Sequence, residues 1–186
     1  MKERIMFVSD FFTWVYCLAP LDLCFCLLIC TLILILAHQH LRSRGWWRWL
    51  LIALLSVWLI ASVWMTVLNR SNDISEMPQF IPFYSLWTAY ATQNMEILRS
   101  NFMNVALFYP AGLLLALVVP YQWSFFRRFL MVTMVFALYS LTIELMQYLY
   151  HLGHAEMDDI IHNTIGAAFG CAVTAIEQKF HWKSRK

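Results

Sequence analysis

The sequence predicts an all-α fold: a polytopic integral membrane helix bundle of about five transmembrane helices, with interfacial amphipathic helices beside it. Of the 186 residues, 61% are hydrophobic and only 13% are charged, whereas soluble domains carry about 25% charged residues. The apolar residues also fall into long runs, and one membrane crossing takes about 20 such residues. Five crossings would use most of the chain, so residues 1–186 are expected to form a single membrane domain.

The apolar runs define the expected elements in order along the chain. Residues 5–18 are interpreted as a helix that either inserts into the membrane or lies at its interface, and Pro20 marks the start of the next element. The five predicted spans follow at residues 21–37, 49–68, 101–119, 129–150 and 159–176.

The longest polar connection, residues 69–100, contains a segment with helical periodicity. Its apolar side chains form one stripe, and Pro82 suits the first position of a helix. This pattern predicts an amphipathic helix on the outer surface of the membrane, with an ordinary loop carrying scattered aromatic residues as the alternative. The stripe consists of Phe83, Leu86, Trp87, Tyr90, Asn94 and Ile97.

Basic residues are distributed unequally between the two sides of this arrangement. The 38–48 loop, the 120–128 loop and the C-terminal tail carry nine of the 13 Lys and Arg residues, and Glu177 is their single acidic residue. Cytoplasmic loops are enriched in Lys and Arg, and tryptophan gathers at membrane interfaces, as it does here beside Arg42, Arg44 and Arg48. The distribution predicts an N-terminus outside and a C-terminus inside.

Three predicted spans carry polar pairs near their outer ends. Ser140, Glu144 and Gln147 share one helical face, as do Asp159 and Asn163, because their spacings are three or four residues. Asn101 and Asn104 form the third pair. An acid within a span costs on the order of 2.5–3.5 kcal/mol and usually has a partner and a function.

Two interpretations of these pairs stay open. They could simply hydrogen-bond to one another and fasten the helices, or they could line an outward-facing polar site. The candidate ligand-binding residues are Asn104, Ser140, Glu144, Gln147, Asp159 and Asn163.

Small residues suggest where helices approach closely. Gly166 and Gly170 form a GxxxG match, which permits close helix contact. Packing within the bundle is the preferred use, and homodimerisation is the second. Pro110 and Gly112 are expected at a similar contact. No sequence pattern indicates a metal site, a cofactor or nucleic-acid binding.

Four sequence blocks, in this order, resemble the VanZ-like family of bacterial membrane proteins. They are "FIPF" at 80–83, "NVALFYPAG" at 104–112, "SLTIELMQ" at 140–147 and "DDIIHNTIGAAFG" at 158–170. The resemblance is strongest over residues 80–170, and the VanZ-like region is expected to cover about 21–177. It implies a multi-pass protein of the bacterial cytoplasmic membrane that lowers susceptibility to teicoplanin-type glycopeptide antibiotics. A general role in the cell envelope is equally open.

The preferred hypothesis is a non-enzymatic protein that binds an amphiphile, either a lipid-linked cell-wall intermediate or a lipoglycopeptide, among the membrane lipids. The alternative is a membrane-embedded enzyme that acts on a lipid-linked envelope substrate. In that case Glu144 and Asp159 are the candidate catalytic residues, because two carboxyl groups of different burial can divide the acid and base roles. A small transporter ranks third.

Overall fold

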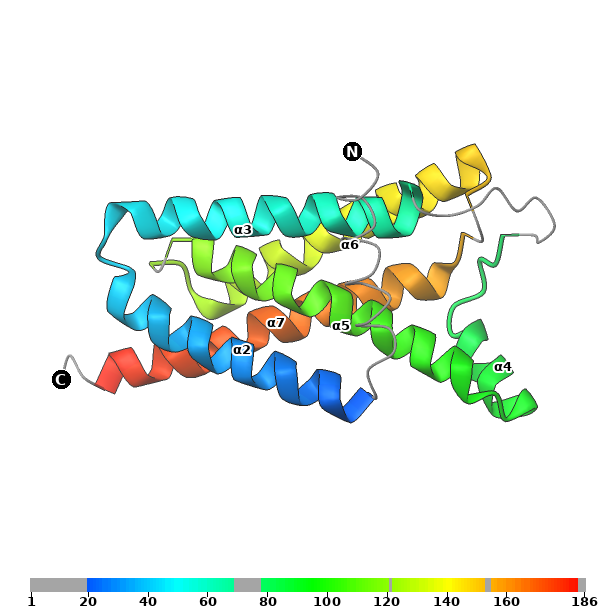
Figure 1. Ribbon diagram of the computed structural model, residues 1–186, viewed down its shortest axis with the longest axis horizontal. Helices are drawn as coiled ribbons and strands as arrows, with labels where there is room; N and C mark the ends of the chain where they lie inside the picture. The colour runs from blue at the N-terminus through cyan, green and yellow to red at the C-terminus, as the bar shows by residue number, and fades with distance from the viewer. Residues whose placement is uncertain (1–19, 69–77, 121, 153–154, 184–186) are drawn as a thin grey trace, which may run out of the picture.

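A computed structural model describes residues 20–68, 78–120, 122–152 and 155–183 of the chain. This part of the chain contains six α-helices, one of which continues into a short π-helix, and the all-α prediction is confirmed (Figure 1). The predicted helix at 5–18 lies outside the described residues.

The first two helices form an antiparallel hairpin. Helix α2 (Pro20–Leu41) and helix α3 (Gly45–Val63) are joined by a tight turn. In this turn the backbone N–H of Arg44 donates to the Leu41 carbonyl at 2.8 Å. The indole Nε1 of Trp47 also donates to His38 Nδ1 at 2.9 Å, which ties the two helices together at the turn.

Helix α3 ends in a π-helical segment, η1 (Trp64–Leu68). The hydroxyl groups of Ser62 and Thr66 donate to the backbone carbonyls of Leu59 and Ser62, respectively. Such bonds compete with the regular ladder of a helix. The altered turn presents the Thr66 carbonyl to a side chain of another helix, as described below.

The amphipathic helix of the polar connection is shorter than predicted. Helix α4 (Tyr84–Thr92) stops at Gln93, which adopts a left-handed conformation with φ 53°. Pro82 precedes the helix instead of opening it, because Phe83 is itself left-handed with φ 62°. The prediction of one stripe running to Ile97 is therefore wrong. Trp87 and Tyr90 are nevertheless 69% and 74% exposed, as expected for a helix whose aromatic face meets lipid.

Helix α5 (Met95–Val118) begins six residues before the predicted span. Asn94 is its N-cap, and the Asn94 side chain accepts from the backbone N–H of Glu96 at 2.9 Å. Helix α6 (Phe125–Tyr150) also begins early, with Ser124 as its N-cap. In both cases a capping side chain satisfies a free N–H group and extends the helix into a polar segment.

Helix α7 (Met157–Lys183) runs in the same direction as α5 and packs against both α5 and α6. At the contact with α5, the backbones of the two helices approach each other directly. A Cβ atom on Gly112 would lie 2.1 Å from the Ala167 carbonyl oxygen, and one on Gly166 would lie 2.2 Å from that of Val105. A Cβ atom on Gly170 would lie 2.1 Å from the Tyr109 carbonyl oxygen. Pro110 lies inside α5, where it is half-buried.

Four helical stretches in the described part of the chain are long and apolar enough to cross a membrane: Pro20–Leu41, Gly45–Leu68, Met95–Val118 and Phe125–Tyr150. They correspond to the first four predicted spans. Helix α7 has 27 residues but is not among these four, and the fifth crossing stays a prediction.

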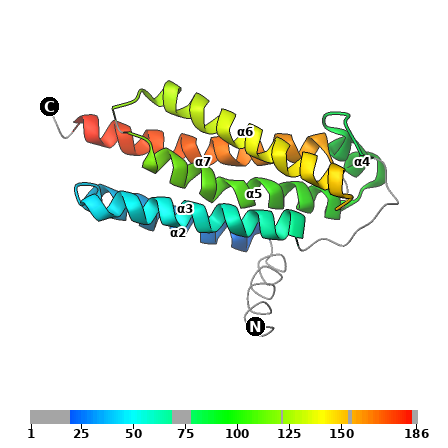
Figure 2. The same cartoon turned by 90° about the horizontal axis from the view of Figure 1, so that it is seen from above.

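The two ends of the bundle differ in charge. The α2–α3 turn, the α5–α6 connection and the C-terminal end of α7 lie together at one end, called here the basic end (Figures 1 and 2). Helix α4 and the start of α7 lie at the opposite end, called the α4 end. The loops rich in Lys and Arg therefore lie together at one end of the bundle, as the distribution of basic residues predicts. Which end faces the cytoplasm stays a prediction.

Candidate functional site

The polar residues at the α4 end form pairs across helix boundaries. Asn104 Nδ2 of α5 donates to Asp159 Oδ1 of α7 at 2.6 Å. Both residues are only partly buried, so this pair is within reach of solvent or a ligand. A carboxylate acceptor makes the bond charge-assisted, which is roughly twice as strong as a neutral hydrogen bond.

A second pair lies one helical turn further along α7. Asn163 Nδ2 donates to Ser140 Oγ of α6 at 2.9 Å, and both side chains are buried. Helix α7 therefore carries a bond to α5 and a bond to α6 on successive turns. This pair fastens the bundle from within.

Glu144 points into the protein. Its side chain is 5% exposed, and Oε2 accepts from the backbone N–H of Glu156 at 2.9 Å. Glu156 directly precedes α7, so the carboxylate holds the start of that helix against α6. A hydrogen bond to a backbone N–H is one of the few ways in which a buried carboxylate is stabilised.

Gln147 bonds to a different part of the structure. Its side chain is fully buried, and Nε2 donates to the Thr66 carbonyl of η1 at 2.8 Å. The last carbonyls of a helix have no partner within the helix, and Gln147 supplies one from α6. The six predicted residues thus gather at one end, but Gln147 connects α6 to the second span.

A further cluster at this end was not among the predicted site residues. Asp158 accepts from the backbone N–H groups of Phe83 and Ser85, and from Ser85 Oγ at 2.5 Å. Asn101 Nδ2 donates to the same hydroxyl at 2.9 Å. Asp158 thereby caps the N-terminus of α4, where a negative charge is favoured. The sequence contains both partners of this cluster, the "FIPF" block and the paired aspartates. Nothing in the sequence indicated that the two segments are in contact.

Backbone pairing completes this connection. Gln79 N–H donates to the Ala155 carbonyl, and the N–H of Met157 donates to the Gln79 carbonyl, each at 2.9 Å. The segment before α4 is therefore held to the segment before α7 by backbone and side-chain bonds together. This arrangement positions α4 directly beside α5 and α7, the helices that carry Asn104 and Asp159.

The residues that meet at this end fall within the part of the chain that is similar to known proteins. Residues 49–177 match the VanZ/LLP1 family. The chain belongs to this family. The matched region begins four residues after the start of α3 and includes all the paired polar residues described above, from Thr66 of η1 to Asn163 of α7.

One curated relative supports the membership. Protein VanZ from Enterococcus faecium is 28% identical to the chain over 134 residues, which cover 72% of this chain and 78% of the relative. No solved structure matches the chain.

An apolar groove lies on the face of this VanZ/LLP1 protein that α2, α5 and α7 share. Its volume is about 520 Å³. Its walls include Cys24 and Leu28 of α2, Val105 of α5, and Phe169 of α7. Val105 directly follows Asn104, so the groove begins near the level of the Asn104–Asp159 pair.

Proposed function

We propose that this VanZ/LLP1 protein binds an amphiphile at the α4 end and thereby lowers susceptibility to teicoplanin-type antibiotics. The amphiphile is a lipid-linked cell-wall intermediate or a lipoglycopeptide. Its headgroup contacts the Asn104–Asp159 pair, and its hydrocarbon chain occupies the groove between α2, α5 and α7.

The observation that carries this proposal is that a partly exposed polar pair and an apolar groove occur at a similar level of the bundle, at neighbouring positions of α5. Asn104 and Asp159 are partly exposed, while Val105, the next residue, lines a groove of about 520 Å³. Ligand sites are typically concave and apolar with a few fixed polar groups, at about 300–1,000 Å³. A molecule with a polar head and a long chain matches both parts.

Unused hydrogen-bonding capacity at this end supports a polar headgroup. In the described part of the chain, the buried side-chain atoms without a hydrogen-bond partner include Gln147 Oε1, His162 Nδ1 and Asn163 Oδ1. Leaving such an atom unsatisfied costs about 1–3 kcal/mol. The two amide oxygens accept hydrogen bonds, so they favour a headgroup or water with O–H or N–H donors, such as a sugar or a peptide.

The hydrocarbon chain explains why teicoplanin should be affected more than vancomycin. Each buried CH₂ adds about 0.8 kcal/mol to membrane association. A tailed glycopeptide therefore concentrates in the leaflet where the groove opens, whereas vancomycin lacks that tail and stays in water.

The test is protection in cells. Expressed in a susceptible Gram-positive host, the wild-type protein should raise the inhibitory concentration of teicoplanin more than that of vancomycin. Asp159→Ala should lose this protection. Asp22→Asn is the matched control, because Asp22 is exposed in the first turn of α2 and lies outside the site. If Asp159→Ala is made at wild-type levels and still protects fully, the polar cluster only fastens helices.

The groove is tested separately. Cys24 lines it, whereas Cys26, two residues away on the same helix, does not, and both side chains are exposed. Cys24→Trp should fill the groove and reduce teicoplanin protection, while Cys26→Trp should leave it unchanged. Equal protection by both variants would remove the groove from the proposal.

A further inference from the structure

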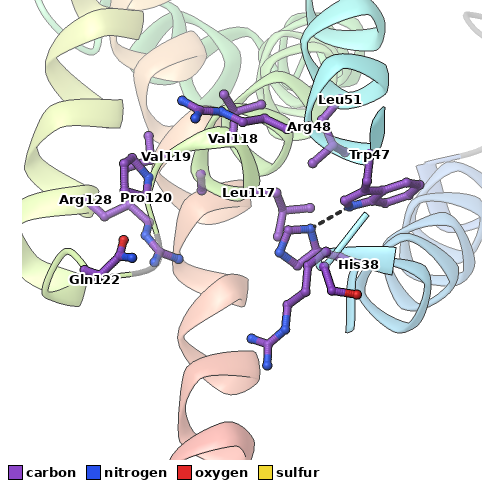
Figure 3. A pocket seen from close by; sticks show the side chains of 13 residues that line it. His38, Trp47, Arg48, Leu51, Leu117, Val118, Val119, Pro120, Gln122 and Arg128 are labelled. Atoms are coloured by element: carbon purple, nitrogen blue, oxygen red, sulfur yellow. Dashed lines mark hydrogen bonds between the residues drawn. The ribbon is translucent and has the colours of Figure 1, made fainter. Parts of the chain in front are cut away.

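A second cavity lies at the basic end, between the α2–α3 turn and the α5–α6 connection (Figure 3). Its volume is about 550 Å³. The charged side chains that line it in the described part of the chain are basic: Arg42, Arg48 and Arg128, with His38 beside them. No acidic residue is among its 13 lining residues in the described part of the chain.

We propose that this cavity binds a phosphate group, the shared chemistry of a phospholipid headgroup and of free phosphate. Guanidinium groups match phosphate oxygens with two parallel N–H donors, and such bonds are charge-assisted. Three guanidinium groups around one cavity, with no carboxylate among the lining residues that the structure describes, favour an anion of concentrated charge.

Arg128 gives the site a fixed charge. Its side chain is 2% exposed although it stands in the first turn of α6, after the Ser124 cap. Figure 3 shows it on the α6 side of the cavity, across from His38. A buried guanidinium cannot lose its proton, so the wall of the cavity stays positive at every physiological pH.

The opposite wall is held rigidly by the α2–α3 hairpin. His38 Nδ1 accepts from Trp47 Nε1 at 2.9 Å, and both side chains are buried. Because Nδ1 is the acceptor, the ring proton lies on Nε2, which leaves Nε2–H as the donor of the ring. Arg42 follows in the turn, and Arg48 stands in the first turn of α3.

The remaining walls favour a lipid as the source of the phosphate. Leu51, Leu117 and Val118 line the cavity beside the arginines. Trp46 and Trp49, on the same turn of α3, are 54% and 72% exposed. Exposed tryptophans gather at the level of lipid headgroups. The cavity therefore opens where a phosphate and the first carbons of a lipid chain lie together.

Binding is measured by native mass spectrometry of the full chain in detergent. The probe is dioleoyl phosphatidic acid, and the comparison ligand is dioleoylglycerol, which has the same chains without the phosphate. The protein should retain phosphatidic acid and not dioleoylglycerol. Excess inorganic phosphate separates the two sources: displacement of the lipid assigns the site to soluble phosphate, and persistence assigns it to the lipid headgroup.

Paired variants locate the binding. The double variant Arg42→Gln with Arg48→Gln removes two lining charges that are exposed, so the fold should be kept. We expect about tenfold weaker retention or more, as for the loss of charge-assisted hydrogen bonds. The control is Arg44→Gln with Arg127→Gln, which removes two exposed charges at the same end that do not line the cavity.

The control should bind phosphatidic acid as the wild type does. Equal retention of phosphatidic acid and dioleoylglycerol would overturn the proposal, because no phosphate would then be recognised. Equal loss in both double variants would overturn it too, since the effect would come from surface charge in general. Neither result bears on the amphiphile site, which lies at the other end of the bundle.

Discussion

Asp158 stabilises the α4 end through hydrogen bonds that connect different helices. It is 3% exposed and accepts from two backbone N–H groups and one hydroxyl of the α4 start. Asp158→Asn keeps the size of the side chain but turns one acceptor into a donor that faces other donors. We expect a loss of about 1–3 kcal/mol in the free energy of unfolding, since a buried donor is left unsatisfied.

Thermal unfolding of the detergent-purified protein measures this loss as a lower midpoint. The control is Asp22→Asn, which removes an equal charge from an exposed position at the same end. A midpoint for Asp158→Asn that equals the control would mean that α4 does not depend on this carboxylate.

At the residue scale, helical spacing predicted which polar residues share a face but not which partners they meet. Asp159 and Asn163 do lie on one face of α7, yet they bond to α5 and α6, respectively. The partner of Gln147 is a backbone carbonyl at the π-helical end of α3. A π-helix leaves no clear periodic signal, so this contact could not be predicted from the sequence.

The α5–α7 contact is the element-scale feature that should be most sensitive to substitution. Gly166→Leu would place side-chain atoms where the Val105 backbone already lies, because even a Cβ would stand 2.2 Å from its carbonyl oxygen. Overpacking of this kind costs about 1–3 kcal/mol, occasionally more. We expect a lower thermal midpoint and loss of teicoplanin protection together.

Gly45→Ala is the control for glycine replacement in a helix. Nothing lies within 4 Å of a Cβ built at Gly45, in the first turn of α3. This variant should keep the wild-type midpoint. A Gly166→Leu protein that is as stable as Gly45→Ala would contradict the close backbone contact between α5 and α7.

Element order and type were predictable because the apolar runs are long, whereas the boundaries depended on single side chains. Asn94, which was expected within the amphipathic stripe, caps α5, and Ser124 caps α6 within the predicted 120–128 loop. The positive φ of Phe83 and Gln93 limits α4 to nine residues. Neither residue type signals a left-handed conformation, so the predicted stripe ran through both.

At the scale of the whole molecule, the charge pattern predicts that the basic end faces the cytoplasm. Ser43 is exposed in the α2–α3 turn, and Thr92 is exposed at the end of α4. With the native cysteines replaced, Thr92→Cys should react with an impermeant thiol reagent in intact cells. Ser43→Cys should react only after permeabilisation. The opposite result would invert the protein and place the Asn104–Asp159 pair on the inner side.

The grouping of loops at two ends followed from the sequence because antiparallel connection of long helices leaves little choice. The two cavities could not be predicted from the sequence. Each is lined by residues from at least three separate segments, such as Leu28, Val105 and Phe169. Their combination depends on how α2 lies against α5 and α7, and sequence periodicity carries no information on that placement.

The most direct test of the central claim is amphiphile binding by the protein in lipid nanodiscs. Two probes are used, teicoplanin and a purified lipid-linked cell-wall intermediate, with empty nanodiscs as the reference and vancomycin as the tail-free comparison. At least one probe should bind the wild type and Asp22→Asn above the reference, while vancomycin should not. Asp159→Ala should reduce that binding about tenfold or more, as the loss of a charged hydrogen-bond partner predicts. Binding of both probes that equals empty nanodiscs, or that survives Asp159→Ala undiminished, would contradict an amphiphile site at the α4 end.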